Sequence, residues 1–132
     1  MTPTALRSFC LKLPAATYDL KWGQDHVYSV GGKMFAVVFD ARKGAETVSF
    51  KVEEGRFLEL TDRPGIVPAP YLARAKWVQL TSLGALGDAE LKALLARSHA
   101  LVCAKLTRAD RAKLGLEPVP AVKGPPARSA GR

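Results

Sequence analysis

The sequence predicts a small α+β domain in which an antiparallel sheet has an N-terminal and a C-terminal helix packed on one face, as a two-layer sandwich. Apolar residues recur at helical spacing near the start of the chain and again over residues 88–105. Between them, residues 17–52 read as consecutive strands with connections too short for crossover helices. Each helix has one apolar stripe, so both can pack on the same sheet face. The other face is then available for binding.

The first helix is predicted from Thr2 and Pro3, an N-cap residue followed by proline at the first helical position. An amphipathic stripe follows at Leu6, Phe9, Cys10 and Leu13. Pro14 ends the helix, because the residue before a proline is forced out of the α region.

Three strands are predicted next, over residues 17–22, 26–30 and 33–39. Gly31-Gly32 between the last two is a two-residue hairpin signal, since both positions of a type I′ turn need positive φ. The run 33–39 is apolar on both faces and should be a central strand.

After a loop over residues 40–45, alternation over 46–52 predicts another strand. A short helix over 53–62, an extended edge segment over 66–70 and a strand over 76–81 follow.

The clearest helix begins at Asp88, which we expect to be its cap, and runs to about Lys105. A further helical turn is expected within 110–116. We assign residues 1–106 to the α+β domain and 107–132 to a flexible, basic, proline-rich tail. Residues 105–132 have seven basic residues against two acidic ones, so most of the net charge of +8 lies there.

The composition favours a soluble, cytoplasmic protein. No stretch approaches the roughly 20 apolar residues that span a bilayer, and the first residues lack the order of a signal peptide. Cys10 and Cys103 form no CxxC pair and are expected to be buried, reduced thiols. His26 and His99 lie in no ligand pattern, so no metal site is expected.

No catalytic motif is present in the sequence. There is no GxSxG, P-loop or GxGxxG pattern, and Glu53-Glu54 lies at a helix start, where acids favour the dipole. We therefore expect a non-catalytic protein without a cofactor.

The chain resembles the MmcQ/YjbR family of small bacterial proteins over roughly residues 5–105. The matching segments are 10–17, 21–23, 30–36, 48–51, 60–65, 70–78 and 88–91 with Ser98. The resemblance implies a frataxin-type (CyaY-like) α+β fold and DNA binding through two hairpin wings. The wing candidates are the Gly31-Gly32-Lys33 turn and the 40–45 loop. Frataxins have an acidic first helix and strand, whereas Asp19 is the only acid in residues 1–20 here, so iron binding does not follow.

The first functional hypothesis is electrostatic, weakly selective binding of double-stranded DNA by the open sheet face and the wings. The cations expected to contact phosphates are Lys33, Arg42, Lys43, Lys51, Arg74 and Lys76. The alternative for these residues is a solvated face with scattered charges.

The second hypothesis is a small-molecule or protein-interaction module. Its groove would be lined by Trp22, Tyr71 and Trp77, with Trp22 and Trp77 on strands beside lysines. The alternative for these aromatics is ordinary packing.

Overall fold

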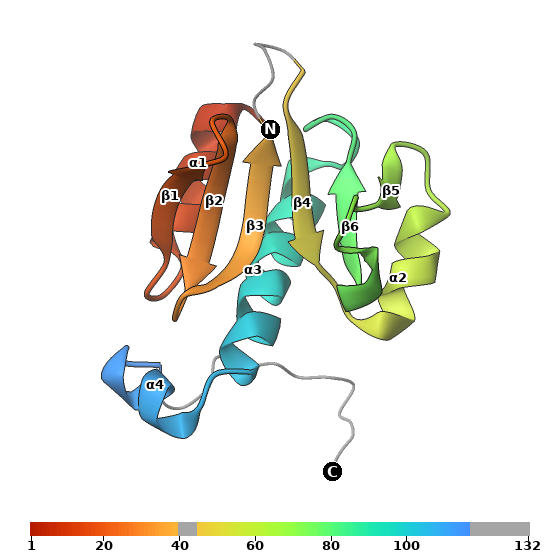
Figure 1. Ribbon diagram of the computed structural model, residues 1–132. Helices are drawn as coiled ribbons and strands as arrows, with labels where there is room; N and C mark the ends of the chain where they lie inside the picture. Colours follow the sequence, from red (N-terminus) through yellow and green to blue (C-terminus); the bar gives the residue numbers. More distant parts are fainter. Residues whose placement is uncertain (40–44, 117–132) are drawn as a thin grey trace.

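The computed structural model describes residues 1–39 and 45–116, and over these residues the chain forms one six-stranded antiparallel sheet with helices (Figure 1). The strand order is β1-β2-β3-β4-β6-β5. The strands are β1 (Thr17–Lys21), β2 (Asp25–Val30), β3 (Lys33–Phe39), β4 (Thr47–Lys51), β5 (Ile66–Pro68) and β6 (Trp77–Leu80). The predicted α+β class is confirmed, and the proline-containing segment is an edge strand, as expected.

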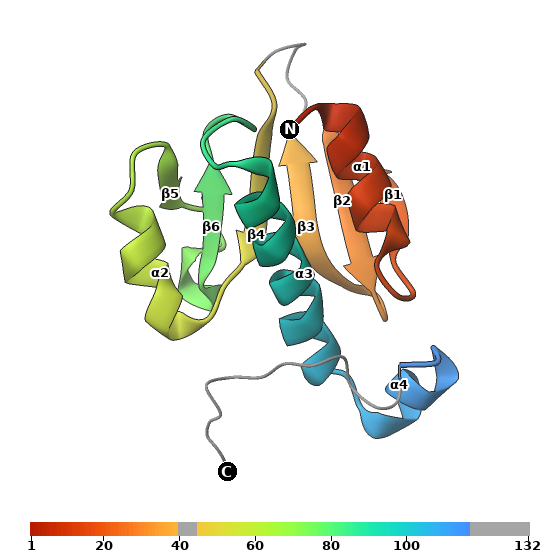
Figure 2. The same ribbon diagram turned by 180° about the vertical axis from the view of Figure 1, so that it is seen from behind.

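The two longest helices, α1 (Pro3–Lys12) and α3 (Asp88–Ala104), lie side by side on one face of the sheet (Figure 2). Their apolar stripes bury the core against alternate residues of the strands, including Tyr28, Phe35 and Phe50. Helix α2 (Glu54–Thr61) lies beside β5 and β6. No helix among the described residues is long and apolar enough to cross a membrane.

The N-terminal ends of the two long helices differ. Thr2 caps α1 as predicted, its Oγ accepting from the amide of Ala5 at 3.1 Å. Asp88 was expected to cap α3, but Gly87 is the N-cap and Asp88 is the first helical residue. The Asp88 carboxylate instead pairs with the amine of Met1 at 3.0 Å. Because an acid in the first turn also complements the helix dipole, the same signal fits both positions.

A β-bulge at the start of β3 is stabilised by the buried hydroxyl of Ser98. In the β2–β3 ladder Tyr28 pairs with Ala36 but Ser29 pairs with Met34, so Phe35 is the extra residue. The β3–β4 ladder begins only at Ala36–Phe50. Ser98 Oγ donates to Phe35 O at 2.6 Å and accepts from the Lys51 amide at 3.0 Å. One helical hydroxyl thus replaces a strand-to-strand bond where β3 and β4 diverge.

The end of the described chain packs on the domain. Thr107 caps α4 (Arg108–Lys113), and Leu116 is 3% exposed within the core. Residues 107–116, assigned above to the tail, therefore include a short helix and a core residue. The rest of that predicted tail, residues 117–132, lies outside the described residues.

Candidate functional site

The open face of the sheet is apolar at its centre. Figure 1 looks onto this face, with α1 and α3 behind the sheet. Val27 of β2 and Met34, Val37 and Phe39 of β3 are on this side, since the alternate residues face the helices. Phe39 is 39% exposed although it is an aromatic residue in a central strand. An apolar open face does not fit a purely phosphate-binding sheet.

A groove of about 700 Å³ crosses this face. It extends from the β1–β2 turn, over β3, to the connection after β5. Its lining residues are Trp22, Asp25, Met34, Val37, Phe39, Ser49, Pro70, Tyr71, Leu72 and Gln79. A large apolar surface with few polar groups is the usual composition of a ligand site.

Trp22 and Tyr71 project from opposite sides of this groove on strained backbone. Trp22 lies in the turn after β1, not on the strand as predicted, with φ of 53°, and Tyr71 has φ of 65°. Left-handed backbone costs a non-glycine residue about 1–2 kcal/mol. The side chains are 70% and 103% exposed, so core packing does not offset that cost. Strain of this kind concentrates at ligand-binding positions.

Trp77, the third predicted groove residue, does not line the groove. It is 5% exposed, and its amide donates to Leu72 O at 3.2 Å. The short η1 helix (Ala73–Ala75), just before Trp77, folds back on β6 (Figure 1). For Trp77 the alternative interpretation, ordinary packing, therefore applies. Sequence alternation put it on the open face correctly, but did not show the segment that covers it.

Three of the predicted cations meet at one end of the sheet. Lys51, Arg74 and Lys76 line a shallow depression of about 440 Å³ together with Lys105, the C-cap residue of α3. We call these four residues the basic end. Lys51 Nζ donates to Ala75 O at 2.6 Å, and the pKa of Lys51 is lowered by burial and by Lys105. Lys76 Nζ lies 5.2 Å from the centroid of the Phe57 ring.

Acidic residues only partly neutralise the basic end. Glu53 and Glu54 line the same depression. The Glu53 carboxylate is already paired with Arg97 of α3. The guanidinium of the exposed Arg74 forms no ion pair within the described part of the chain. The basic end therefore keeps a net positive charge.

The two predicted wings flank β3 in the sequence. Lys33 begins this strand, at the same end of the sheet as Lys51, and is exposed. Gly31 and Gly32 have φ of 60° and 80°, as the hairpin prediction requires. The candidates of the 40–45 loop, Arg42 and Lys43, lie outside the described residues.

The two cysteine thiols of the core are buried and not activated. Burial raises the pKa of Cys10 to about 12, which disfavours the thiolate. Cys103 is also a free, buried thiol, beside His99. Among the described residues, no group of His, Cys, Asp or Glu side chains could hold a metal ion.

The comparisons with known proteins agree with this fold. The YjbR family model matches residues 11–101. The chain belongs to the YjbR family. The Deinococcus radiodurans protein DR2400, which has a DUF419 domain, is 30% identical, with a TM-score of 0.78 over 91% of this chain and 95% of that one.

A Pseudomonas syringae protein is 21% identical, with a TM-score of 0.66 over 77% of this chain and 99% of that one. It is similar in fold alone. A comparison with the curated proteins gave no match. The family model and the Deinococcus protein support the family, both solved structures support the fold, and none of them names a ligand.

Sequence reasoning missed the floor of the groove. The run 33–39 is apolar on both faces, which we interpreted as burial on both sides. In the structure one face of β3 packs on α3, while Met34, Val37 and Phe39 line the groove. The same signal therefore fits a buried strand and a strand with an apolar binding face.

Proposed function

We propose that this protein is a non-catalytic nucleic-acid-binding module that takes single-stranded segments across its open face. Bases would stack on Trp22 and Tyr71 in the groove, and phosphates would lie at the basic end. The observation on which the proposal rests is the pair of exposed aromatic rings held on strained backbone at one groove. Every base has a π-face, so such rings bind unpaired bases with little sequence preference.

Charge complementarity supports the orientation of this ligand. Trp22 has Lys21 Nζ 5.9 Å from its ring centroid, while Asp25 lies in the groove beside it. At the other side, Tyr71 precedes Arg74 and Lys76 by only a few residues. The charges of Lys21 and Asp25 offset each other beside Trp22, so phosphates are attracted to the basic end, which keeps a net positive charge.

A single strand fits this surface better than the duplex expected from sequence. Duplex bases are stacked and expose only their edges in the grooves. Aromatic platforms need bases that are already unstacked.

The test is a titration of a labelled single-stranded oligonucleotide and its duplex across a salt series. We expect the single strand to bind more tightly. If two or three phosphates are contacted, the slope of log K against log salt should be about −1.5 to −2. Trp22→Asn and Tyr71→Asn should each weaken binding roughly 5- to 150-fold, the effect of losing one stacked base. Asparagine tolerates positive φ, so the backbone is preserved.

Matched controls separate this proposal from its alternatives. Leu58→Gln removes an equally exposed apolar side chain from α2 and should leave binding unchanged. Arg74→Gln should reduce the salt slope, whereas Lys92→Gln on α3 should not. Equal binding by wild type and both asparagine variants contradicts the proposal.

A small-molecule or protein-interaction role is the second candidate, because most of the groove lining is apolar. Its signature is affinity that depends on Trp22 and Tyr71 but does not change with salt. Two results together would favour this role. The nucleic-acid titration would show no binding, and a flat apolar dye would bind independently of salt. The asparagine variants would abolish binding of the dye.

A further inference from the structure

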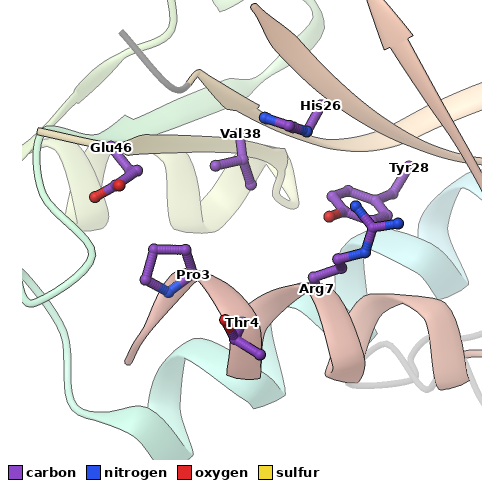
Figure 3. A pocket seen from close by; sticks show the side chains of 7 residues that line it. All are labelled: Pro3, Thr4, Arg7, His26, Tyr28, Val38 and Glu46. Carbon is purple, nitrogen blue, oxygen red and sulfur yellow. The ribbon is translucent and has the colours of Figure 1, made fainter. Parts of the chain in front are cut away.

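A second, smaller pocket lies on the helix side of the sheet, where the first turns of α1 meet β2 and β3 (Figure 3). Its volume is about 150 Å³. Its polar groups belong to Thr4, Arg7, His26, Tyr28 and Glu46. A cavity of roughly this volume holds a molecule the size of benzene. The pocket shares no lining residue with the groove.

The hydroxyl of Tyr28 is buried without a partner. Tyr28 is 2% exposed, and Figure 3 shows its oxygen directed into the pocket. Across residues 1–39 and 45–116, no side chain or backbone group forms a hydrogen bond with it. Buried hydroxyls are almost always hydrogen-bonded. Burial raises the pKa of Tyr28 to about 12, so at neutral pH the group is a donor.

The guanidinium of Arg7 belongs to the same pocket as this hydroxyl. Its central carbon lies 4.2 Å from the centroid of the Tyr18 ring. The Tyr18 hydroxyl is itself 2.7 Å from Nδ1 of His26. The Tyr18 side chain therefore contacts both the Arg7 guanidinium and the His26 imidazole. In the described part of the chain Arg7 forms no ion pair, and α1 has no acid in its first turn. A guanidinium offers five donors and no acceptor.

We propose that this pocket binds a small carboxylate of about six non-hydrogen atoms, such as a short hydroxy acid or amino acid. The carboxylate would accept hydrogen bonds from Arg7 and from the Tyr28 hydroxyl. Glu46 lies across the pocket from Arg7 (Figure 3), so its carboxylate oxygens and the Thr4 hydroxyl can accept hydrogen bonds from the other end of the ligand. That end is therefore taken to be a hydroxyl or an ammonium group.

The experiment is an NMR titration of the full chain with acetate, glycolate, glycine and inorganic phosphate. We expect saturable shifts at the signals of Tyr28 and Arg7, tightest for glycolate or glycine. Arg7→Gln and Tyr28→Phe should each weaken that binding at least about tenfold, the loss of one charge-assisted hydrogen bond. Lys12→Gln removes the same charge from the far end of α1 and should leave the affinity unchanged.

Two results overturn the proposal: no saturable shift with any of the four probes, or equal affinities for wild type and Arg7→Gln. Tightest binding of phosphate, lost in Arg7→Gln, overturns the carboxylate assignment while keeping an anion site. Arg7 is exposed, so its variant should fold, and a well-dispersed NMR spectrum checks this. No residue substituted here takes part in the nucleic-acid proposal, so each can fail without the other.

Discussion

The two faces of the sheet carry similar residue types, but these residues are buried on one face and exposed on the other. On the helix-covered face, aromatic rings, a serine and a histidine are buried, and the side chains of the serine and the histidine are hydrogen-bonded: Ser98 binds two strands and His99 binds Pro14 O at 2.7 Å. On the open face, aromatic rings are exposed on strained backbone and surround a groove. Residue type alone therefore does not separate buried from exposed aromatic positions in this chain. Coverage by a neighbouring segment does.

The two tryptophans give the largest expected contrast. Trp77→Ala should lower the free energy of unfolding by about 3–5 kcal/mol, because it removes a buried ring and leaves a cavity. Trp22→Asn should change it by less than about 0.5 kcal/mol, because the ring is 70% exposed and asparagine tolerates the positive φ. Urea unfolding of both variants measures the difference. Similar costs would mean that Trp22 is a packing residue and not a binding one.

The two buried serines give a smaller contrast of the same kind. Ser98→Ala should cost about 2–4 kcal/mol, because the Phe35 carbonyl and the Lys51 amide both lose their partner in the core. Ser49 is 8% exposed in the groove, and its side chain forms no hydrogen bond to any described residue. Ser49→Ala should therefore cost less than about 0.5 kcal/mol.

Chemical denaturation of the two alanine variants measures both values, and amide exchange at Lys51 reports the bulge directly. Faster exchange at Lys51 in Ser98→Ala, with the rest of β4 unchanged, is the expected local signature. A cost for Ser98→Ala below 1 kcal/mol would mean that β3 and β4 can close the bulge without the hydroxyl.

Most of the fold followed from local signals, while the site required contacts between distant segments. Thr2 and Pro3, the Gly31-Gly32 turn and the stripe of α3 each act within a few residues, so their patterns predicted the elements. The covering of Trp77 by residues 72–75 and the bridge from Ser98 to two strands are set by tertiary packing. The alternation of residues 76–81 does not show that Trp77 is covered, and the helical stripe does not show that Ser98 bridges two strands.

The predicted cations illustrate the same limit. Lys51, Arg74 and Lys76 come from a strand, a helical turn and its cap, and only the antiparallel pairing of β4 with β6 brings them together. Lys33 lies at the same end of the sheet, but it does not line the depression that the basic end forms. Charge counting named these three residues without indicating that the fold brings them together beside an apolar groove.

The smallest expected effect concerns the pH dependence of the covered face. Burial lowers the pKa of His99 below its usual value of 6.5, and the hydrogen bond to Pro14 O only partly opposes this. Below pH 6.5 the unfolded chain therefore binds a proton that the folded chain does not. The stability that neutral His99 provides is complete above pH 6.5 and is lost as the pH falls below it, by no more than about 1.4 kcal/mol per pH unit.

Urea unfolding at pH 7.5 and 5.5 measures this loss, and His99→Gln is the variant that isolates it. Glutamine keeps an N–H donor for Pro14 O but does not titrate, so the pH dependence between these values should become smaller than in wild type. His26→Gln is the matched control, since His26 contacts Tyr18 at the margin of the sheet and is not in the core. An unchanged dependence in His99→Gln would assign the titration to another group and leave His99 with a packing role, through its edge contact with Phe35 at 5.1 Å.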